Sequence, residues 1–406
     1  FRYADGSVET SIPLASVSSR QWRVDYGEQL RNLVRNILSH SNGDRVVGML
    51  IGYMTSGEWF YWGTNERKYS DYSPVNVAAF RAWLAHKYST DAALQAAWHE
   101  PSVTLPTAQI PTPAERDATH AFDLRDPSTS DQKTIDYYRF MADEIIDAQE
   151  HFREIVREET AGRWLTLHYF GYGYELSDYP FRANYGGHKA YARRSFGSPT
   201  LDMAAGPYSY YWRGPGQPGT SHTTQHSWAL YNQLYWHEDD TRPTELPTLI
   251  QLARRNAARQ LIYGGGLWWM DMLTQGWWDY QQFWDAVAPL RVAYEDYLGG
   301  GDRSLDPEFV IIADPDVFAY LNDDTGPSAD AMALQRLWFE SLGARIGYFT
   351  AQDLRQPAFP QEHAKLYYFI NPYAVDDSYL SWIVANLKRD GNVLVWLYAP
   401  GLVTQS

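Results

Sequence analysis

Three acidic residues stand side by side in the segment "WHEDDTR", residues 236–242. Glu238, Asp239 and Asp240 follow the stretch "YNQLYW", which is typical of a buried strand. Neighbouring carboxylates repel one another, and a carboxylate at the end of a buried strand also loses part of its hydration. Such a run is either a solvated turn, an acidic helix start favoured by the helix dipole, or a site that performs chemistry.

A second acid has a similar position earlier in the chain. Glu58 lies in "TSGEWFYWG", directly after the apolar stretch "RVVGMLIGYM". Cleavage of a glycosidic bond needs two carboxyl groups, one as acid and one as nucleophile or base. Glu58 and Glu238 form the best candidate pair, because they follow two different predicted strands. Taken alone, a Glu beside Trp is more often a solvated turn residue, so the pairing depends on the fold.

Aromatic and polar side chains follow the predicted strands and would surround both acids. Aromatic faces suit stacking on sugar rings, whereas carboxylates and amides suit hydrogen bonding to hydroxyls. Arg242 is expected to pair with one of the acids beside Glu238. Single members of the Trp pairs are also ordinary core or rim residues. The side chains expected to contact substrate are Trp59, His168, Tyr172, Tyr208, Trp236, Asp240, Arg242, Trp268, Trp269 and Asp271.

The acidic run leaves two other functions open. The His237–Asp240 cluster, together with His168, has the ligand types of a metal-dependent hydrolase, although the chain has no HxH or HExxH spacing. A catalytically inactive barrel that only binds carbohydrate is the other alternative. The glycosidase pair requires neither a metal nor another cofactor, and we expect none.

Composition limits the class of partner. The 406 residues carry 49 acidic and 34 basic side chains, a net charge of −15, which disfavours nucleic acid and anionic membranes. The 17 Trp and 31 Tyr exceed the needs of a core and suit an oligosaccharide or another glycoside as substrate. The chain has no cysteine, which excludes thiol chemistry but does not fix the compartment. No apolar run is long enough to span a bilayer.

Apolar segments alternate with helical patterns over about three quarters of the chain. Strands that are apolar throughout and alternate with helices indicate a parallel sheet buried on both faces. The length favours a (β/α)8 TIM barrel over a doubly wound sheet, and barrel active sites lie at the C-terminal ends of strands. The predicted strands lie near residues 50, 166, 203, 235 and 268, with "SIPLAS" (11–16) as a sixth candidate.

The glycine-rich segment "GGGDRSLDPE" (299–308) marks a boundary. After it, strands and helices alternate again over about 100 residues. We expect a TIM-barrel catalytic domain at 1–303 and a smaller flavodoxin-like α/β domain at 304–406. Because a closed barrel needs eight strands, we also expect its first strands to lie upstream of residue 1.

The segment "RVVGMLIGYMTSGEWFYWG…DYSPVNVAAFRAWLAHKYSTDAALQAAW" resembles the acid/base segment of glycoside hydrolase family 42, the β-galactosidase-type barrels of clan A. "WHEDDTR" and "GGGLWWMDM" are similar to segments after the seventh and eighth strands of that family's relatives. Residues 306–406 are similar to its second domain, an amidotransferase-like domain that mediates trimers. The resemblance covers most of the chain and is strongest over 46–98.

This resemblance implies retaining hydrolysis of β-glycosidic bonds, with Glu58 as acid/base and Glu238 as nucleophile. It makes a β-galactoside the default substrate and a homotrimer the expected assembly. One position departs from the family, in which an Asn before the acid/base Glu binds the sugar 2-hydroxyl; here Gly57 stands there. Either another group binds that hydroxyl, or the substrate differs, or Glu58 is not the acid/base.

Overall fold

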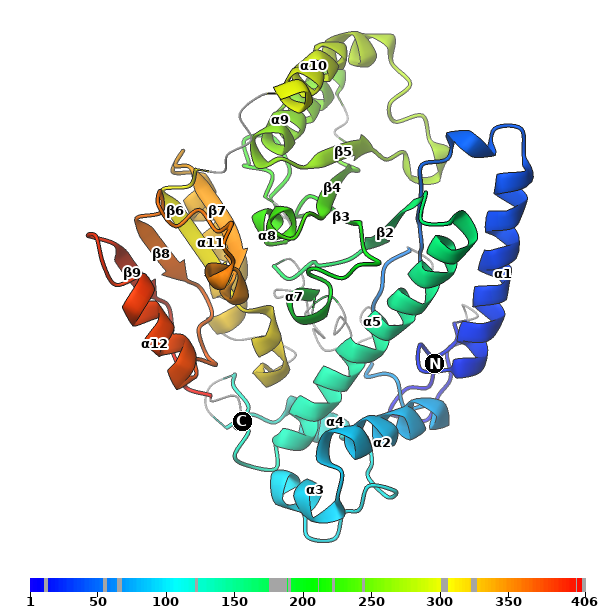
Figure 1. Ribbon diagram of the computed structural model, residues 1–406, viewed down its shortest axis with the longest axis vertical. Helices are drawn as coiled ribbons and strands as arrows, with labels where there is room; N and C mark the ends of the chain where they lie inside the picture. Colours follow the sequence, from blue (N-terminus) through cyan, green and yellow to red (C-terminus); the bar gives the residue numbers. More distant parts are fainter. Residues whose placement is uncertain are drawn as a thin grey trace.

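Two parallel sheets organise the chain (Figure 1). The computed structural model describes residues 1–10, 14–53, 57–63, 68–120, 123–174, 188, 191–210, 212–220, 223–242, 245–300, 306–322, 327–398 and 400–403. The first sheet has five strands in the order β1-β2-β3-β4-β5, and the second has four in the order β7-β6-β8-β9. Among the described helices, none combines the length and the hydrophobicity that crossing a bilayer requires.

Each strand of the first sheet pairs in parallel with the next one along the chain. This confirms the parallel sheet predicted from the sequence. The sixth candidate strand is not found, because residues 14–16 form no strand and residues 11–13 lie outside the described residues. The strands are β1 (Gly48–Leu50), β2 (Leu165–Tyr169), β3 (Met203–Pro207), β4 (Leu234–Asp239) and β5 (Gly266–Trp269).

Within the described residues this sheet does not close. Strands β1 and β5 each pair with one neighbour only, so the five strands form a curved part of a (β/α) barrel rather than the closed eight-stranded barrel. Helices surround it: α1 (Arg20–Ser39), α2 (Pro74–Tyr88), α3 (Asp91–Trp98), α4 (Pro113–Asp117), α5 (Gln132–Thr160), α7 (Tyr191–Arg194), α8 (Gln225–Leu230), α9 (Leu246–Tyr263) and α10 (Gln281–Gly300), with 3-10 turns η1 (Gly43–Arg45) and η4 (Met272–Thr274).

Local sequence signals fix several of these boundaries. Ser73 accepts a hydrogen bond from the Asn76 backbone N–H, and Pro74 occupies the first helical position, as expected for the start of α2. The helix ends where Ser89 adopts a left-handed conformation, with φ of 62°. Helix α5 packs along α1, where the Tyr26 and Phe152 rings meet edge-to-face at 4.8 Å. These two helices support the strand that leads to Glu58.

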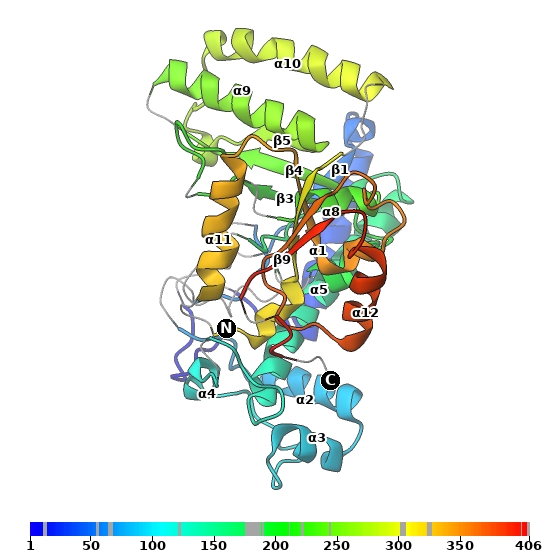
Figure 2. The ribbon, with the colours of Figure 1, turned by 90° about the vertical axis from the view of Figure 1, so that its left-hand side faces the viewer.

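The second sheet has the strand order 2-1-3-4 of a doubly wound fold, in agreement with the predicted α/β pattern. Figure 2 shows α11 and α12 on opposite sides of this sheet. Its elements are β6 (Phe309–Ala313), η5 (Pro315–Tyr320), α11 (Pro327–Glu340), β7 (Ile346–Thr350), η6 (Ala351–Arg355), β8 (Leu366–Phe369), α12 (Asp377–Asn386) and β9 (Val393–Trp396).

Buried polar contacts join the second sheet to helices of the first. Arg259 of α9 forms a two-point ion pair with Glu340 of α11, in which Nη1 lies 2.7 Å from Oε2. The Tyr348 hydroxyl donates to the same carboxylate at 2.6 Å. His226 of α8 accepts from the Tyr348 backbone N–H at 2.8 Å. These contacts hold the two sheets in a fixed relation.

We predict that Glu340→Ala destabilises the protein strongly. The change leaves the Arg259 guanidinium buried without its partner, which typically costs about 3–5 kcal/mol. Glu308→Ala is the matched control, because its ion pair with Arg345 is exposed and such pairs contribute about 1 kcal/mol or less. Thermal unfolding should show a large loss of Tm for the first variant and almost none for the second. Equal losses would contradict this assignment.

Candidate active site

Strand β4 separates the acidic run onto two faces, because successive side chains of a strand point in opposite directions. On the outer face, His237 Nε2 lies 3.3 Å from Gln225 Oε1 of α8. Asp239 accepts a hydrogen bond from Asn256 Nδ2 of α9 at 2.9 Å. Among the described residues, no group of three or more His, Asp or Glu side chains is arranged to hold a metal ion. The alternative of a metal-dependent hydrolase at His237–Asp240 therefore has no support among the described residues.

Glu238 points to the inner face, toward the end of β2. The Tyr169 hydroxyl donates a hydrogen bond to Glu238 Oε2. Tyr169 also pairs through its backbone with Glu58, as an isolated parallel bridge beyond β1. The negative charge of Glu58 acts on Glu238 and raises its pKa, so the two acids lie within electrostatic reach. The two acids thus lie on neighbouring segments beside Tyr169, which donates to one and pairs through its backbone with the other.

The surroundings of Glu238 favour a retained proton. The pKa of its carboxyl is raised to about 7, mainly by burial and to a smaller extent by the charges of Asp240 and Glu58. The Tyr169 hydrogen bond and the Arg213 guanidinium act in the opposite direction and lower it. A set of close carboxylates in which one proton persists near neutral pH meets the need for one acid and one carboxylate.

Arg213, rather than Arg242, neutralises the acid next to Glu238. Arg213 follows β3 and forms an ion pair with the buried Asp240 carboxylate. Arg242 instead donates to Gln275 Oε1 at 3.1 Å and lies over the Trp277 ring. The expected pairing of Arg242 with an acid is therefore wrong. The physical reason is position, since Arg242 lies beyond the strand end and reaches the turn after β5.

Aromatic rings extend from the acid pair along the inner face. The Trp268 ring centre lies 6.1 Å from that of Tyr169 and 6.1 Å from that of Trp236. Trp236 is 36% exposed and offers a free surface to a ligand. Burial and the charges of Glu58 and Glu238 raise the pKa of Tyr172, so this ring also lies near the acids. Trp236 and Trp268 fit the expected sugar platform, whereas Tyr172 is only 3% exposed and lies behind it.

Three expected substrate contacts instead belong to the core. Trp59 is fully buried and donates from Nε1 to the Ile51 carbonyl at 3.0 Å. His168 is equally buried, and its Nδ1 lies 2.9 Å from the same carbonyl. Tyr208 has no exposed surface and donates to the Asn256 carbonyl at 2.8 Å. Because a ligand cannot reach them, the structure contradicts their expected direct contact with substrate.

Two further candidates shape the turn after β5. Trp269 points toward α10, where it meets the Phe283 ring edge-to-face at 5.3 Å. The Asp271 carboxylate accepts backbone N–H groups of Gln275 at 2.8 Å and Gly276 at 2.6 Å. The structure thus places Trp269 in a packing role and Asp271 in the support of a loop.

Sequence reasoning missed three residues near the acids: Tyr169, Tyr210 and Arg213. Tyr169 is the last residue of β2 and occupies the inner face, so the strand-end rule could have selected it. The charges of Asp240, Glu58 and Glu238 all act on Tyr210 and raise its pKa, after the larger effect of burial. Both Tyr210 and Arg213 lie after β3, where no local pattern separates them from their aromatic neighbours.

The position before Glu58 requires glycine in this structure. Gly57 has φ of 82°, which L side chains rarely adopt, and a Cβ there would lie 3.3 Å from Cδ2 of the Tyr169 ring. The Tyr169 ring therefore approaches the space that a side chain at position 57 would occupy. The glycine that replaces the family's Asn thus leaves room for the ring of Tyr169, the residue that donates to Glu238.

Comparison with known proteins supports the resemblance over one segment and the fold over nearly the whole chain. Residues 47–191 match the model of the family described as Beta-galactosidase, Glyco_hydro_42. Beta-galactosidase BgaA of Thermus sp is 27% identical over 151 residues, which cover 37% of this chain and 21% of that protein. The β-galactosidase of Thermus thermophilus gives the same figures. These matches confirm the resemblance to glycoside hydrolase family 42.

Solved structures extend the likeness in fold. The β-galactosidase of the psychrophilic Marinomonas ef1 superposes with a TM-score of 0.58 at 14% identity, over 97% of this chain and 61% of that one. The exo-carrageenase of Bacteroides ovatus gives 0.60 at 12% identity, over 96% and 54%. The chain therefore spans little more than half of these relatives. They support the α/β barrel architecture, and their different named substrates show that the fold alone does not select one.

We predict that Glu238→Gln stabilises the protein above neutral pH. The folded-state pKa of about 7 exceeds the ordinary value of 4.5, so ionisation of Glu238 destabilises the fold as pH rises through this interval. The neutral amide removes this penalty, an upper bound of about 3 kcal/mol at pH 8. The difference should fall to about 1 kcal/mol or less at pH 5.

Thermal unfolding of both proteins at pH 5 and pH 8 checks this. Glu245→Gln is the control, because Glu245 is exposed and its side chain makes no capping hydrogen bond. A stability difference for Glu238→Gln that is equal at the two pH values would contradict the raised pKa.

Proposed function

We propose that the chain acts as a retaining glycoside hydrolase, in which Glu58 is the acid/base and Glu238 the nucleophile. The observation that carries the proposal is the position of both acids beside Tyr169, close enough for the charge of Glu58 to raise the pKa of Glu238. The aromatic rings beside them suit a sugar ligand. The family match over residues 47–191 contains Glu58 and supports the same chemistry.

The proposed reaction has two steps. In the first, Glu58 gives its proton to the glycosidic oxygen while Glu238 attacks the anomeric carbon, so the leaving alcohol departs and a glycosyl-enzyme ester forms. In the second, Glu58 removes a proton from water, which displaces Glu238 from the anomeric carbon. Each step inverts the anomeric centre, so the product retains the configuration of the substrate.

Tyr169 and Arg213 prepare Glu238 for attack. Nucleophilic attack requires the carboxylate form, whereas burial of Glu238 favours the protonated form. The Tyr169 hydroxyl stabilises the charged form directly, and Arg213 offsets the charge of Asp240. We propose that these two contacts determine the pH range in which Glu238 is able to react.

A β-galactoside is the default substrate, by similarity to the Thermus β-galactosidases. The inner-face rings Trp236 and Trp268 would stack on it, and Tyr172 would border the reacting sugar. The exo-carrageenase among the structural relatives makes sulfated galactans a second substrate class to include in a screen.

We assign catalysis to residues 1–303 and assembly to residues 304–406, with a homotrimer as the expected state.

A closed barrel also requires strands in addition to the five described ones. A groove of about 860 Å³, lined mainly by apolar side chains including Trp236, Trp284 and Val287, runs beside the open edge of β5. We infer that further strands pair with the open edges of β1 and β5.

Replacement of the two acids should produce different kinetic signatures on aryl β-galactosides. Glu58→Gln should lower kcat/KM by about 10²–10⁴-fold, with the smallest loss for leaving groups that need no proton. Glu238→Gly should abolish hydrolysis, and added azide should restore turnover by attacking the anomeric carbon directly. The azide product should have the configuration opposite to that of the substrate.

Glu245→Gln, on the exposed start of α9, serves as the control and should retain activity. If both acid variants hydrolyse every glycoside as fast as the unchanged protein, the assignment is wrong. If the unchanged protein binds oligosaccharides without any turnover, the barrel is a carbohydrate-binding module instead.

Removal of the Tyr169 hydroxyl should move the pH profile. Because its hydrogen bond lowers the pKa of Glu238, Tyr169→Phe should raise that pKa and shift the acidic limb of kcat/KM upward by about one pH unit. The measurement is kcat/KM from pH 5 to pH 9, with Tyr280→Phe, an exposed residue, as the control. An unmoved or downward-shifted limb would refute this role of Tyr169.

A further inference from the structure

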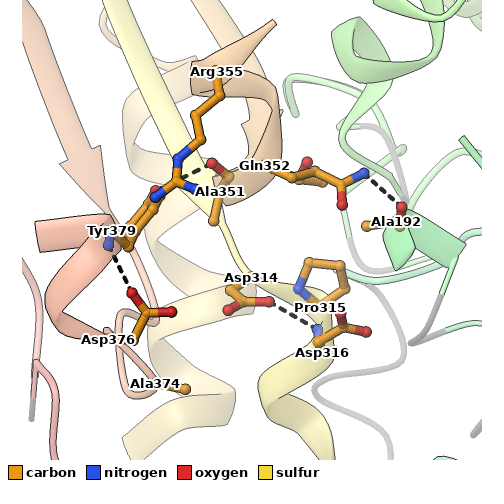
Figure 3. Close-up of a pocket in the computed structure, with 11 residues that line it drawn as sticks. Ala192, Asp314, Pro315, Asp316, Ala351, Gln352, Arg355, Ala374, Asp376 and Tyr379 are labelled. Atoms are coloured by element: carbon orange, nitrogen blue, oxygen red, sulfur yellow. Dashed lines mark hydrogen bonds between the residues drawn. The ribbon is translucent and has the colours of Figure 1, made fainter. Parts of the chain in front are cut away.

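A second pocket lies at the C-terminal edge of the four-stranded sheet and shares no residue with the candidate active site. Its volume is about 220 Å³, and its lining comes from the segments after β6, β7 and β8, together with Ala192 of α7 (Figure 3). In the order β7-β6-β8-β9, β7 is added on one side of β6, whereas β8 and β9 are added on the other side. The order in which strands are added therefore reverses between β6 and β8. Open α/β sheets bind ligands in the crevice at this switch point.

One wall of the pocket carries two carboxylates, on which Arg139 and Arg193 act from outside the lining. Asp314 and Asp316 follow β6, and the Asp316 backbone N–H donates to Asp314 Oδ1 at 3.0 Å. Asn371 anchors Asp314, because its side chain accepts from the Asp314 N–H at 2.7 Å and donates to the Asp314 carbonyl at 2.8 Å. Within the described residues, neither acid forms an ion pair. The sheet therefore fixes two acidic side chains at the pocket, where burial raises the pKa of both, that of Asp314 to about 7.

A single cation approaches the pocket from a different side. Arg355 ends η6, and its guanidinium lies 5.3 Å from the ring centre of Tyr379 and 5.9 Å from that of Trp382. Asp376, which also lines the pocket, feels the charge of this guanidinium, but none of the ion pairs between described residues joins the two side chains. Figure 3 shows Arg355 across the pocket from Asp314 and Asp316. Opposite charges thus face the same cavity without contacting each other.

This lining is complementary to a ligand with both charges. An ammonium group would satisfy the two carboxylates, and a carboxylate would match the planar donors of Arg355. A sugar would fit less well, because Arg355 already lies over the aromatic faces on which a sugar would stack. The remaining lining is mixed: Thr350 and a third carboxylate, Asp376, are polar, whereas Ala351 and Ala374 are small and leave room for a short side chain.

We propose that the pocket at the switch point of the second sheet binds a small zwitterion of the α-amino acid class. The carboxylate of the ligand pairs with Arg355, and its ammonium group pairs with Asp314 and Asp316. Gln352, which also lines the pocket, donates to the Ala192 carbonyl of α7 at 2.5 Å. The occupied pocket would therefore contact both the second sheet and the barrel part of the chain.

Isothermal titration calorimetry with L-alanine tests the proposal on the intact protein. Acetate and ethylamine, each with one of the two charges, should bind far more weakly, and D-galactose should not bind at this pocket. Arg355→Gln and Asp316→Asn should each weaken L-alanine binding by at least about tenfold, the loss expected for one charge-assisted contact. Asp377→Asn, an exposed residue outside the lining, is the matched control and should bind normally.

Thermal unfolding without ligand shows whether each variant is folded, and Arg355→Lys, which keeps the charge, should recover part of the binding. Absence of L-alanine binding, binding unaffected by both pocket variants, or preferential binding of D-galactose there would each overturn the proposal. Hydrolysis of aryl glycosides is a separate readout. The pocket variants should leave it unchanged in the absence of amino acid, so failure here is distinguishable from failure of the proposed hydrolase.

Discussion

The alternation of side chains along β4 is the constraint on which the candidate site depends. Three adjacent acids in a flexible turn would repel one another and remain solvated. In a strand that lies between β3 and β5, the same residues are forced to opposite faces. Asp239 is hydrogen-bonded by a helix on the outer face, whereas Glu238 and Asp240 enter the concave side. The fold thereby separates three like charges: Asp239 is held by a helix, whereas Glu238 and Asp240 enter the candidate active site.

The inner face carries an electrostatic cost that the structure only partly offsets. Arg213 neutralises Asp240, and Tyr169 donates to Glu238, yet burial still raises the pKa of Glu238 to about 7. A site built for stability alone would place a neutral or apolar side chain there. Retention of a destabilised carboxylate is typical of catalytic sites, in which the same group must change its protonation state or charge during reaction.

The sequence predicted most of the strands and helices, and it suggested the acid pair that we propose. Apolar segments alternating with helical ones predicted both sheets, because the periodicity is strong, and strands β3, β6 and β7 are buried along their whole length. Glu58 and Glu238 followed from the rule that barrel chemistry lies at strand ends. Arg213 was not predicted, because its pairing with Asp240 joins two loops 27 positions apart, and nothing local distinguishes it from Arg242. Trp59 and His168 were misplaced because strand-end position does not reveal which face a side chain occupies.

The most direct test of the central claim is to trap the reaction intermediate. A 2-deoxy-2-fluoro β-galactoside with a good leaving group should inactivate the protein and add one sugar per chain. Peptide mass spectrometry should then locate that sugar on Glu238. Attachment to Glu58, to Asp240 or to Asp271 would contradict the assigned roles. Turnover of the parent glycoside with inversion of configuration would contradict the retaining mechanism itself.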